Sequence, residues 1–394
     1  MASHGSDRLN QRALEGSGVI PGSDLLASVN STRARTFTIT RTTDLLDPQN
    51  PALHEASGFA KRQLVVADDG IGSAQLTRLH EYFRSCSVEA ETVVLPGGEH
   101  IKRWDSVERL VDAFGAFGLI RRGEPVIIIG GGAVMDVGAF ACSIYRRGVP
   151  HIKVPTTVLG YVDASLGIKS AVNLRGLKNR LGSFVEPVAV LLDPTFFRTL
   201  SQRDLVSGLG EILKLAVGCS HRLLEDLRTH GPDGLATKFQ GSALVLLDRA
   251  VAIMVDELGV DLYENDLERV LDLGHTFSTV IESTEPACHS HGEAVAIDVV
   301  LTLMISAGRG LISFDDVAAI LRLAMALGLP VSPPSEVDGL LWQSVEERSQ
   351  HRDGQQRFPL IASVGEVHFV GDLMPEEVNS ALQRVRALEK EEVC

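Results

Sequence analysis

The stretch PVIIIGGGAVMD, residues 125–136, constrains the fold more than any other part of the chain. A short apolar run enters three glycines, Gly130, Gly131 and Gly132, and a helical pattern follows. Glycines let a backbone approach a pyrophosphate closely, and the N–H groups that begin a helix favour an anion. The pattern is not GxGxxG, and a purely structural turn is the alternative. Asp136, one turn into the helix, favours a dinucleotide site.

The same order of apolar run and amphipathic pattern recurs through the first half of the chain. Strands are expected at 62–69, 88–100, 125–132 and 151–157, with helices between them. This alternation predicts an α/β fold, a parallel sheet with helices on both faces.

Beyond about residue 195 strand-like runs nearly vanish. Helices are expected at 203–218, 241–258, 267–283 and 292–308, followed by a hairpin at 357–370 and a closing helix from Pro375 to about Lys390. We therefore expect a mobile arm (1–34), an NAD-binding α/β domain (35–195) and a mostly helical domain (196–394) that binds metal and substrate.

Composition excludes several classes of protein. The formal net charge of −14 argues against binding to nucleic acid or to an anionic membrane surface. No signal peptide and no uninterrupted membrane span is evident. The cysteines are scattered without CxxC spacing, which favours free thiols in a reducing cytoplasm; they are Cys86, Cys142, Cys219, Cys288 and Cys394.

Two further segments favour a nucleotide. Asp68 ends an expected strand, where a carboxylate commonly accepts hydrogen bonds from ribose hydroxyls. The segment GGEHIK places Glu99 and Lys102 three residues apart after another strand end. Solvated loop charges are the alternative for each of them.

A metal site is the second hypothesis. His275 and His291 each lie inside a helical pattern, and GLGEILKLAV carries Glu211 and Lys214 on one side of another helix. One carboxylate and two imidazoles make a common three-ligand zinc set with open positions. Two histidines satisfied by hydrogen bonds in a core are the alternative.

A cationic loop at 161–184 is the third candidate site. It is dense in Lys, Arg and Asn and punctuated by glycine, which suits a phosphate group. Lys169 is expected in an apolar setting, whereas Arg175 fits a solvated basic loop. The polar residues are Asp163, Lys169, Asn173, Arg175, Lys178, Asn179 and Arg180.

Together these segments resemble the sugar phosphate cyclase superfamily, whose best-known member is 3-dehydroquinate synthase. The motifs occur in order: GGG-xxx-D at 130–136, RRGVPHIKVPTT at 146–157, VDASLGIK at 162–169, KN at 178–179, GEILK at 210–214, LGHTF at 273–277 and HGEAV at 291–295. The resemblance runs from about residue 60 to about 370.

The resemblance implies NAD, a divalent metal (Zn²⁺ or Co²⁺) and a homodimer with its site between the two domains. By position, the metal ligands are Glu211, His275 and His291. Substrate and catalytic positions are Asp163, Lys169, Asn179 and Lys214; Thr156, Thr157 and Lys178 lie near the cofactor; and Arg147 reaches the partner subunit's phosphate site. The implied reaction is oxidation, phosphate elimination, reduction and intramolecular aldol cyclisation, which makes the enzyme a carbon–oxygen lyase.

The chain departs from the dehydroquinate pattern where that enzyme binds a substrate carboxylate. Glu268 and Met254 stand in place of an Arg and a Lys, and Asp272 and Thr279 replace an Asn and a His. A buried substrate carboxylate facing Glu268 would have no compensating charge and would be disfavoured, whereas acids accept hydrogen bonds from hydroxyls. This change resembles the branch that uses sedoheptulose 7-phosphate.

The product and the phosphate contacts depend on single positions. Thr279, where other branches are expected to have proline, favours 2-epi-valiolone, with 2-epi-5-epi-valiolone as the alternative. His351 and Arg352 are the expected replacements for a phosphate-binding Lys. A 3-dehydroquinate synthase, a metal-dependent polyol dehydrogenase that releases NADH and a non-catalytic sugar phosphate sensor are the competing hypotheses.

Overall fold

The structure is a computed structural model that describes residues 36–283 and 289–393. The predicted arm at 1–34, as well as Cys288 and Cys394, lies outside the described residues. From Phe37 onward the chain forms one compact unit. The three described cysteines, Cys86, Cys142 and Cys219, have free thiols, as predicted.

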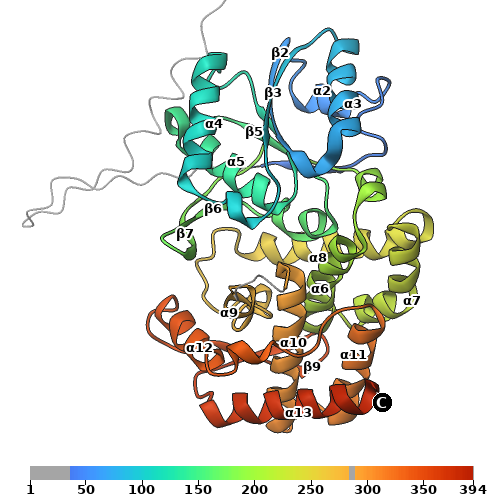
Figure 1. Cartoon of the computed structure of the whole chain (residues 1–394), viewed down its shortest axis with the longest axis vertical. Coiled ribbons are helices and arrows are strands. Elements are labelled where there is room, and N and C mark those ends of the chain that lie inside the picture. Colours follow the sequence, from blue (N-terminus) through green and yellow to red (C-terminus); the bar gives the residue numbers. More distant parts are fainter. Residues whose placement is uncertain (1–35, 284–288, 394) are drawn as a thin grey trace, which may run out of the picture. The chain divides into compact units, whose positions relative to one another are not determined.

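The first half is built on a six-stranded sheet in which every pair of neighbours is parallel, in the order β1-β8-β5-β4-β2-β3 (Figure 1). Because β2 aligns Ala67 with Ile129 of β4, the carboxyl ends of the central strands meet at one edge. The strands are β1 (Thr38–Arg41), β2 (Arg62–Asp68), β3 (Glu89–Leu95), β4 (Val126–Gly130), β5 (His151–Pro155) and β8 (Ala189–Leu192).

Helices cover both faces of this sheet, which confirms the predicted fold class. Leu64, Val66 and Ile128 pack in one core with α4 and α5, while Val65 and Ile127 pack on the other face with α2 and α3. Central strands therefore read as unbroken apolar runs, since both faces are buried. The helices are α2 (Ala52–Ala56), α3 (Gly72–Ser85), α4 (Trp104–Phe117) and α5 (Gly132–Ile144).

The segment predicted as a cationic loop is a β-hairpin. A π-helical turn at Gly160–Ala164 leads into β6 (Lys169–Leu174) and β7 (Leu177–Phe184), which pair antiparallel. Arg175 and Gly176 form the turn, and both have positive φ, at 51° and 80°. The prediction of a loop was wrong because these two short strands are rich in polar side chains and lack the apolar pattern by which strands are predicted.

The second half is helical, as predicted, and ends in the expected hairpin and helix. Its elements are α6 (Gln202–Cys219), α7 (His221–Thr237), α8 (Leu244–Val260), α9 (Ser278–Glu282), α10 (His291–Gly308), α11 (Phe314–Ala326), α12 (Leu341–Gln350), β9 (Phe358–Ser363), β10 (Glu366–Val370) and α13 (Pro375–Val393).

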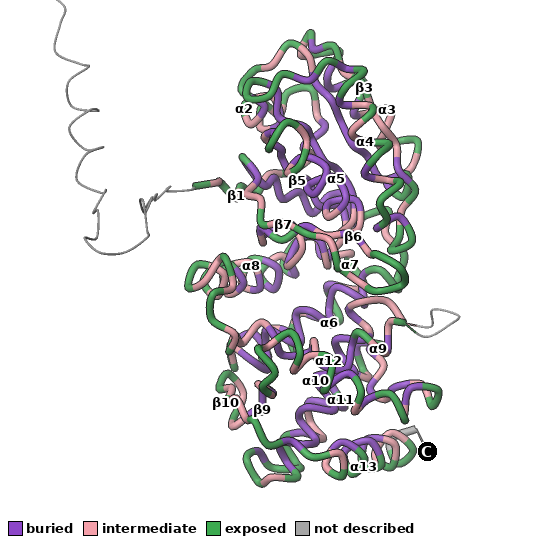
Figure 2. Tube along the Cα trace, turned by 90° about the vertical axis from the view of Figure 1, so that its left-hand side faces the viewer, coloured by how far each residue is buried: buried purple, intermediate pink, exposed green. Residues whose placement is uncertain are grey.

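Helix α10 is the centre of this half. It is long and apolar enough to cross a membrane by composition, yet 83% of it is buried inside the protein, as expected of a core helix. Figure 2 shows it in purple among the surrounding helices. Of the described helices, only α10 meets that length and hydropathy test.

One long predicted helix, at 267–283, is wrong. The chain there forms a 3₁₀ turn at Val270–Asp272, a loop through His275, and only then the short helix α9. Leu273 is extended and Gly274 has φ +78°, a conformation that ends a helix and that glycine adopts without strain. His275 therefore lies in a loop rather than on a helix.

Candidate active site

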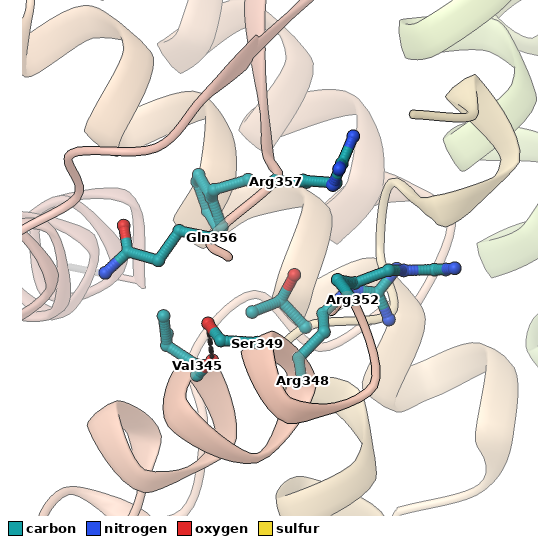
Figure 3. A pocket seen from close by; sticks show the side chains of 8 residues that line it. Val345, Arg348, Ser349, Arg352, Gln356 and Arg357 are labelled. Atoms are coloured by element: carbon teal, nitrogen blue, oxygen red, sulfur yellow. Dashed lines mark hydrogen bonds between the residues drawn. The ribbon is translucent and has the colours of Figure 1, made fainter. Parts of the chain in front are cut away.

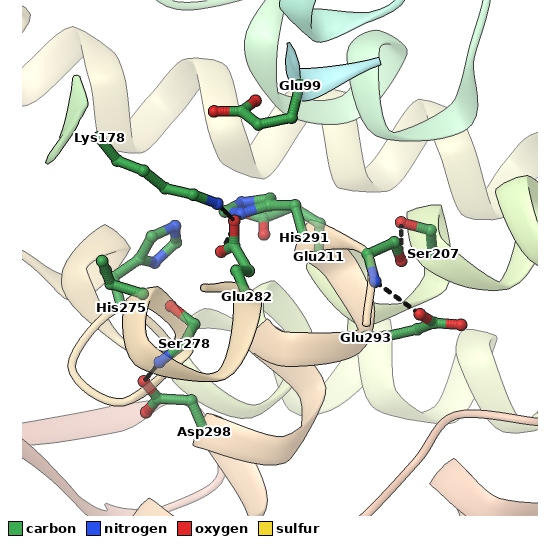
Figure 4. Close-up of polar contacts among 12 residues, drawn as sticks. Glu99, Lys178, Ser207, Glu211, His275, Ser278, Glu282, His291, Glu293 and Asp298 are labelled. Carbon is green, nitrogen blue, oxygen red and sulfur yellow. Dashed lines mark hydrogen bonds and ion pairs between the residues drawn. The ribbon is translucent and has the colours of Figure 1, made fainter. Parts of the chain in front are cut away.

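The three predicted metal ligands come together from three segments. Glu211 lies on α6, His275 on the loop before α9, and His291 is the first residue of α10. One ligand atom from each lies within 4.8 Å of the others. The two imidazole rings are 5.4 Å apart between centroids. Figure 4 shows these side chains converging on one point.

Two facing glycines explain how α6 and α10 come close enough to share the site. A Cβ on Gly210 would lie 1.9 Å from the carbonyl oxygen of Gly292, and a Cβ on Gly292 would lie 1.7 Å from that of Ser207. Only glycine permits this approach. Since Glu211 follows one glycine and His291 precedes the other, the close packing brings both ligands together.

Hydrogen bonds orient both imidazoles. Nδ1 of His275 lies 3.0 Å from the carbonyl oxygen of Leu273, and Nδ1 of His291 lies 2.8 Å from Oε1 of Glu282. Each Nδ1–H donates to its oxygen, which leaves Nε2 as the ring atom that would ligate a metal. A carboxylate or carbonyl behind each ligand is the usual arrangement around metal-binding histidines.

The loop that carries His275 is held by Asp298 of α10. This fully buried carboxylate accepts hydrogen bonds from the backbone N–H groups of Phe277 and Ser278, the latter at 2.9 Å (Figure 4). Its second oxygen accepts from the hydroxyl of Thr302 at 3.3 Å. Asp298 thus fixes the start of α9 to the helix that carries His291.

The donor set fits a divalent metal. Glu211 is fully buried, and its Oε1 forms an ion pair with Lys214 that compensates its charge. Its Oε2 has no hydrogen-bond partner among the described residues, and an unpartnered buried carboxylate oxygen is costly unless a donor or a cation meets it. Glu211, His275 and His291 together would hold Zn²⁺ or Co²⁺ with open coordination positions.

The charges within the site shift the pKa values of the two imidazoles in opposite directions. Burial, reinforced by the ammonium of Lys214, lowers the pKa of His275 well below 6.5, so this ring is neutral. Burial alone would lower the pKa of His291, but the adjacent Glu282 carboxylate more than reverses this and raises it to about 9. His291 would therefore release a proton on becoming a metal ligand.

The glycine turn lies at the carboxyl edge of the sheet, as predicted for a dinucleotide. A Cβ on Gly130 would lie 2.5 Å from the Cβ of Asp68, so the turn and the end of β2 are in close contact. The Asp68 carboxylate accepts hydrogen bonds from Gly131 N at 3.1 Å and from Gly70 N at 2.8 Å. Gly131 caps α5, whose first N–H groups point to the same edge.

The other predicted cofactor residues gather beside this turn. Buried Lys102 contacts Asp136 at 2.8 Å, Glu99 at 3.8 Å and the amide oxygen of Asn179 at 2.6 Å. The structure therefore joins three chain segments around one ammonium group. Asn179 has φ +52°, a left-handed conformation that Asn tolerates better than most residues.

Thr156 and Thr157 follow β5 at the same sheet edge. Thr156 N donates to Gly130 O at 3.0 Å, and the Thr157 hydroxyl accepts from Gly160 N at 3.0 Å. Both threonines thus connect the glycine turn to the π-helical turn that carries Asp163. Asp163 is half-buried and close enough to raise the pKa of Glu211 together with the larger effect of burial.

The cations of the β6–β7 hairpin face acids and a histidine of the helical half. Lys169 pairs with Glu264 at 2.9 Å, Lys178 with Glu282 at 2.5 Å, and Arg180 lies 3.5 Å from His351. The Lys169 side chain is 63% exposed, so the expectation of an apolar setting was wrong.

The acids expected to face the substrate have arginine partners that the sequence did not reveal. Asp272 accepts from Arg269 at 2.6 Å and from Arg352 at 2.5 Å, and it lies 3.2 Å from Arg348. Figure 3 shows Arg348, Arg352 and Arg357 around one pocket.

Glu268, the second of these acids, pairs with Arg357 at 3.2 Å. The prediction that a substrate carboxylate facing Glu268 would meet no compensating charge did not take account of Arg357 and of the arginines at Asp272. Sequence alignment alone compared residues at matching positions, and it could not show arginines that approach from α12 and from the segment before β9.

Two predicted residues lie apart from these contacts. Thr279 is exposed on α9, four residues after His275. Arg147 is exposed with φ +65°, in the segment between α5 and β5.

Sequence reasoning missed Glu282, Asp298, Glu264 and Arg348 as parts of the site. Glu282 and Asp298 each stand seven residues after a predicted ligand. For Asp298, which lies on the same helix as His291, two helical turns of spacing were the available signal; His275 lies in a loop, so the spacing to Glu282 carried no such meaning. Arg348, whose Nη1 donates to His275 O at 2.6 Å, had no signal, since it comes from 73 residues along the chain.

Comparison with known proteins agrees with this architecture. The family model described as 3-dehydroquinate synthase N-terminal matches residues 92–207, and the corresponding C-terminal model matches residues 208–347. A 2-epi-5-epi-valiolone synthase of Actinomyces sp is 37% identical over 364 residues, which cover 90% of this chain and 96% of the relative. The enzyme of that name from Streptomyces albus is 40% identical over 328 residues, covering 82% and 80%.

Solved structures show the same fold. The 2-epi-5-epi-valiolone synthase of Streptomyces hygroscopicus subsp. jinggangensis, solved with NAD⁺ and Zn²⁺ bound, superposes with a TM-score of 0.88 at 35% identity, covering 91% of this chain and 99% of that one. A 2-deoxy-scyllo-inosose synthase with carbaglucose-6-phosphate, NAD⁺ and Co²⁺ has a TM-score of 0.72 at 21% identity, covering 89% and 97%, which shows the fold alone.

Proposed function

The chain belongs to the 3-dehydroquinate synthase family of sugar phosphate cyclases, and on that premise we propose that it cyclises sedoheptulose 7-phosphate. The product is a seven-carbon cyclitol ketone, released with inorganic phosphate and without net redox change. The observation that carries the proposal is the convergence of Glu211, His275 and His291 beside the hairpin cations. A carbon–oxygen lyase that eliminates phosphate needs both features.

The cofactor and the metal would supply the redox and Lewis-acid chemistry, and the residues of the chain would bind and orient the substrate and the cofactor. When bound, NAD⁺ supplies a hydride acceptor and the metal supplies a Lewis acid that polarises substrate oxygens. Asp163 accepts a hydrogen bond from a substrate hydroxyl beside the metal ligands, and Lys214 holds its positive charge next to Glu211. The glycine turn at 130–132 and the Lys102 cluster hold the dinucleotide.

The remaining predicted residues form the substrate contacts of this proposal. Lys169 and Asn179 approach the sugar phosphate from the hairpin, and His351 and Arg352 approach it from the end of α12. Arg147 completes the phosphate site of the partner subunit in a homodimer.

The preference for a ketose over a substrate with a carboxylate is supported by two of the positions that the sequence singled out, Met254 and Glu268. Met254 is buried in the helical core, so no cation stands at the position where dehydroquinate synthase has Lys. Glu268, 48% exposed in its side chain, accepts hydroxyl hydrogen bonds while paired to Arg357. We propose that these two positions, rather than the charge of Asp272, exclude the carboxylate.

We propose 2-epi-valiolone as the product because Thr279 stands where proline is expected in the other branches. The names of the relatives favour 2-epi-5-epi-valiolone, which is the second candidate. The two differ in configuration at C5, and product NMR assigns it directly. Product with the 2-epi-5-epi configuration would refute the argument from Thr279.

One mixture tests the activity. With sedoheptulose 7-phosphate, a trace of NAD⁺ and Zn²⁺ or Co²⁺, the protein should release phosphate while absorbance at 340 nm stays flat. Stoichiometric NADH would instead identify a polyol dehydrogenase. The substrate of dehydroquinate synthase, which carries a carboxylate, should react far more slowly, and the His275→Ala variant should lose turnover with both.

The location and domain division remain proposals of the same kind. We propose a cytoplasmic enzyme, supported by the free thiols of Cys86, Cys142 and Cys219. We place the domain boundary near residue 195, where β8 has ended and α6 has not begun. Limited proteolysis with mass mapping tests that boundary.

A further inference from the structure

The carboxylate of Glu282 joins the two halves of the candidate active site. Its Oε1 accepts from Nδ1 of His291 at 2.8 Å, and its Oε2 accepts from Nζ of Lys178 at 2.5 Å. One oxygen therefore faces the metal ligand on α10, and the other faces the β6–β7 hairpin. Figure 4 shows Lys178 extending to Glu282 beside His291.

The contact is built rather than incidental. The side chains of Glu282 and Lys178 are only 13% and 20% exposed. The carboxylate accepts hydrogen bonds from an imidazole and an ammonium group, and charge-assisted hydrogen bonds of this kind are shorter and stronger than neutral ones.

The hairpin carries this contact on to the cofactor cluster. Asn179, the next residue after Lys178, accepts from Lys102 at 2.6 Å, and Lys102 pairs with Asp136 at 2.8 Å on the helix that follows the glycine turn. Asn179 interrupts the regular strand with φ +52°. Its side chain reaches Lys102 while that of Lys178 reaches Glu282, so two adjacent residues contact the dinucleotide half and the metal half.

We propose that Glu282 is a positioning residue that couples metal binding to NAD binding through Lys178. The proposal rests on the proposed function for its two ligands. With a metal bound, the His291 ring would be fixed in orientation, and its hydrogen bond would fix the carboxylate of Glu282. The contact between Glu282 and Lys178 would then keep the β6–β7 hairpin in the position that dinucleotide binding requires. By linkage, each ligand then tightens the binding of the other by the same factor.

The test measures binding rather than turnover. The dissociation constant of NAD⁺ is determined by calorimetry on the full chain with chelator and with saturating Zn²⁺. In the wild type, Zn²⁺ should tighten NAD⁺ binding by at least about fivefold, the lower end of typical coupling. Removal of an oxygen behind a ligating histidine weakens metal binding about 10- to 100-fold, which is the loss expected for Glu282→Gln.

Two variants separate the steps of the coupling. Glu282→Gln offers one acceptor oxygen in place of two, so it should weaken Zn²⁺ binding and abolish the effect of Zn²⁺ on NAD⁺. Lys178→Met keeps Glu282 on His291, so Zn²⁺ binding should change little while the coupling is lost. The double variant should show no coupling beyond that of either single variant.

A matched control lies at the other end of α10. Glu377 pairs with Arg309 through two contacts at 2.7 and 2.8 Å, and Glu377→Gln removes a comparable ion pair far from the metal ligands. It should leave both dissociation constants and their coupling unchanged.

Three results would overturn the proposal: wild type without coupling, Lys178→Met with wild-type coupling, or Glu282→Gln with wild-type Zn²⁺ affinity. If Glu282→Gln fails to fold, Lys178→Met decides the question alone. Failure of the proposed function looks different, because the coupling would persist while sedoheptulose 7-phosphate released no phosphate.

Discussion

The facing glycines of α6 and α10 give a prediction whose size follows from two distances. A Cβ at Gly210 would lie 1.9 Å from Gly292 O, whereas real Cβ contacts shorter than 3.0 Å essentially never occur. Opening 1.9 Å to 3.0 Å separates the helices by about 1.1 Å at this point. Close-packed interiors do not absorb such a change by compression.

Gly210→Ala therefore acts directly on the metal ligands. Glu211 and His291 adjoin the two glycines, and metal bonds to such ligands are about 2.0–2.2 Å long, so a separation near 1 Å breaks one of them. Overpacking of this kind costs about 1–3 kcal/mol. If the metal-bound form carries that cost, Zn²⁺ affinity falls about 5- to 150-fold.

The assay is competition for Zn²⁺ against a chromophoric chelator, with thermal unfolding measured in parallel. Gly115→Ala in α4 is the matched control, because nothing lies within 4 Å of its Cβ position. Alanine there should stabilise the protein by about 0.5–1 kcal/mol and leave Zn²⁺ affinity unchanged. Wild-type Zn²⁺ affinity and stability in Gly210→Ala would show that the helices do not pack as described.

Four further predictions follow from buried groups. Chelation should lower the melting temperature, since a metal at 1,000 times its Kd adds about 4 kcal/mol to the folded state; an unchanged melting curve would argue against a metal. Asp272→Ala leaves arginines uncompensated and should cost about 3–5 kcal/mol in urea denaturation, as for a broken buried ion pair. Lys153→Met removes the donor to Ala164 O and Gly167 O, 3.2 and 2.9 Å away, and should cost about 1–3 kcal/mol for each carbonyl left unpaired. Burial raises the pKa of Asp298 from 3.8 to about 6. Between about pH 4 and pH 6 the folded state therefore binds a proton that the unfolded state has lost, so the free energy of unfolding falls as the pH rises. Asp298→Asn keeps an acceptor for the backbone but cannot titrate, so its free energy of unfolding should lack this slope between about pH 4 and pH 6.

The sequence was most informative where local chemistry and fold coincide. Gly130 between an apolar run and a helix predicted a strand, a turn and a nucleotide site together; the structure has the strand β4, the turn and the helix α5 in place, and the nucleotide site stays a prediction. The ligands Glu211, His275 and His291 were identified through motif resemblance, and they do converge. Spacing along the chain alone could not have joined segments eighty residues apart.

The sequence could not predict which side chains from distant segments pair with the residues of the candidate site. Asp272 was predicted to accept hydrogen bonds from a substrate, yet Arg348 of α12 and Arg352 just after that helix pair with it, and their approach depends on tertiary packing rather than on spacing. The helix expected through His275 failed at Gly274, where positive φ replaced the periodic pattern. An apolar periodicity is a weak guide when one glycine redirects the chain.

The length of α10 carries a consequence for how this protein can vary. His291 and Asp298 stand seven residues apart on this helix, one serving the metal set and the other holding the loop of His275. Each residue advances a helix by about 100° and 1.5 Å. A single inserted or deleted residue between them would turn one group away from its partner, even if every side chain stayed apolar. Relatives built on this helix should therefore exchange apolar residues at its other positions, but should not gain or lose a residue between His291 and Asp298.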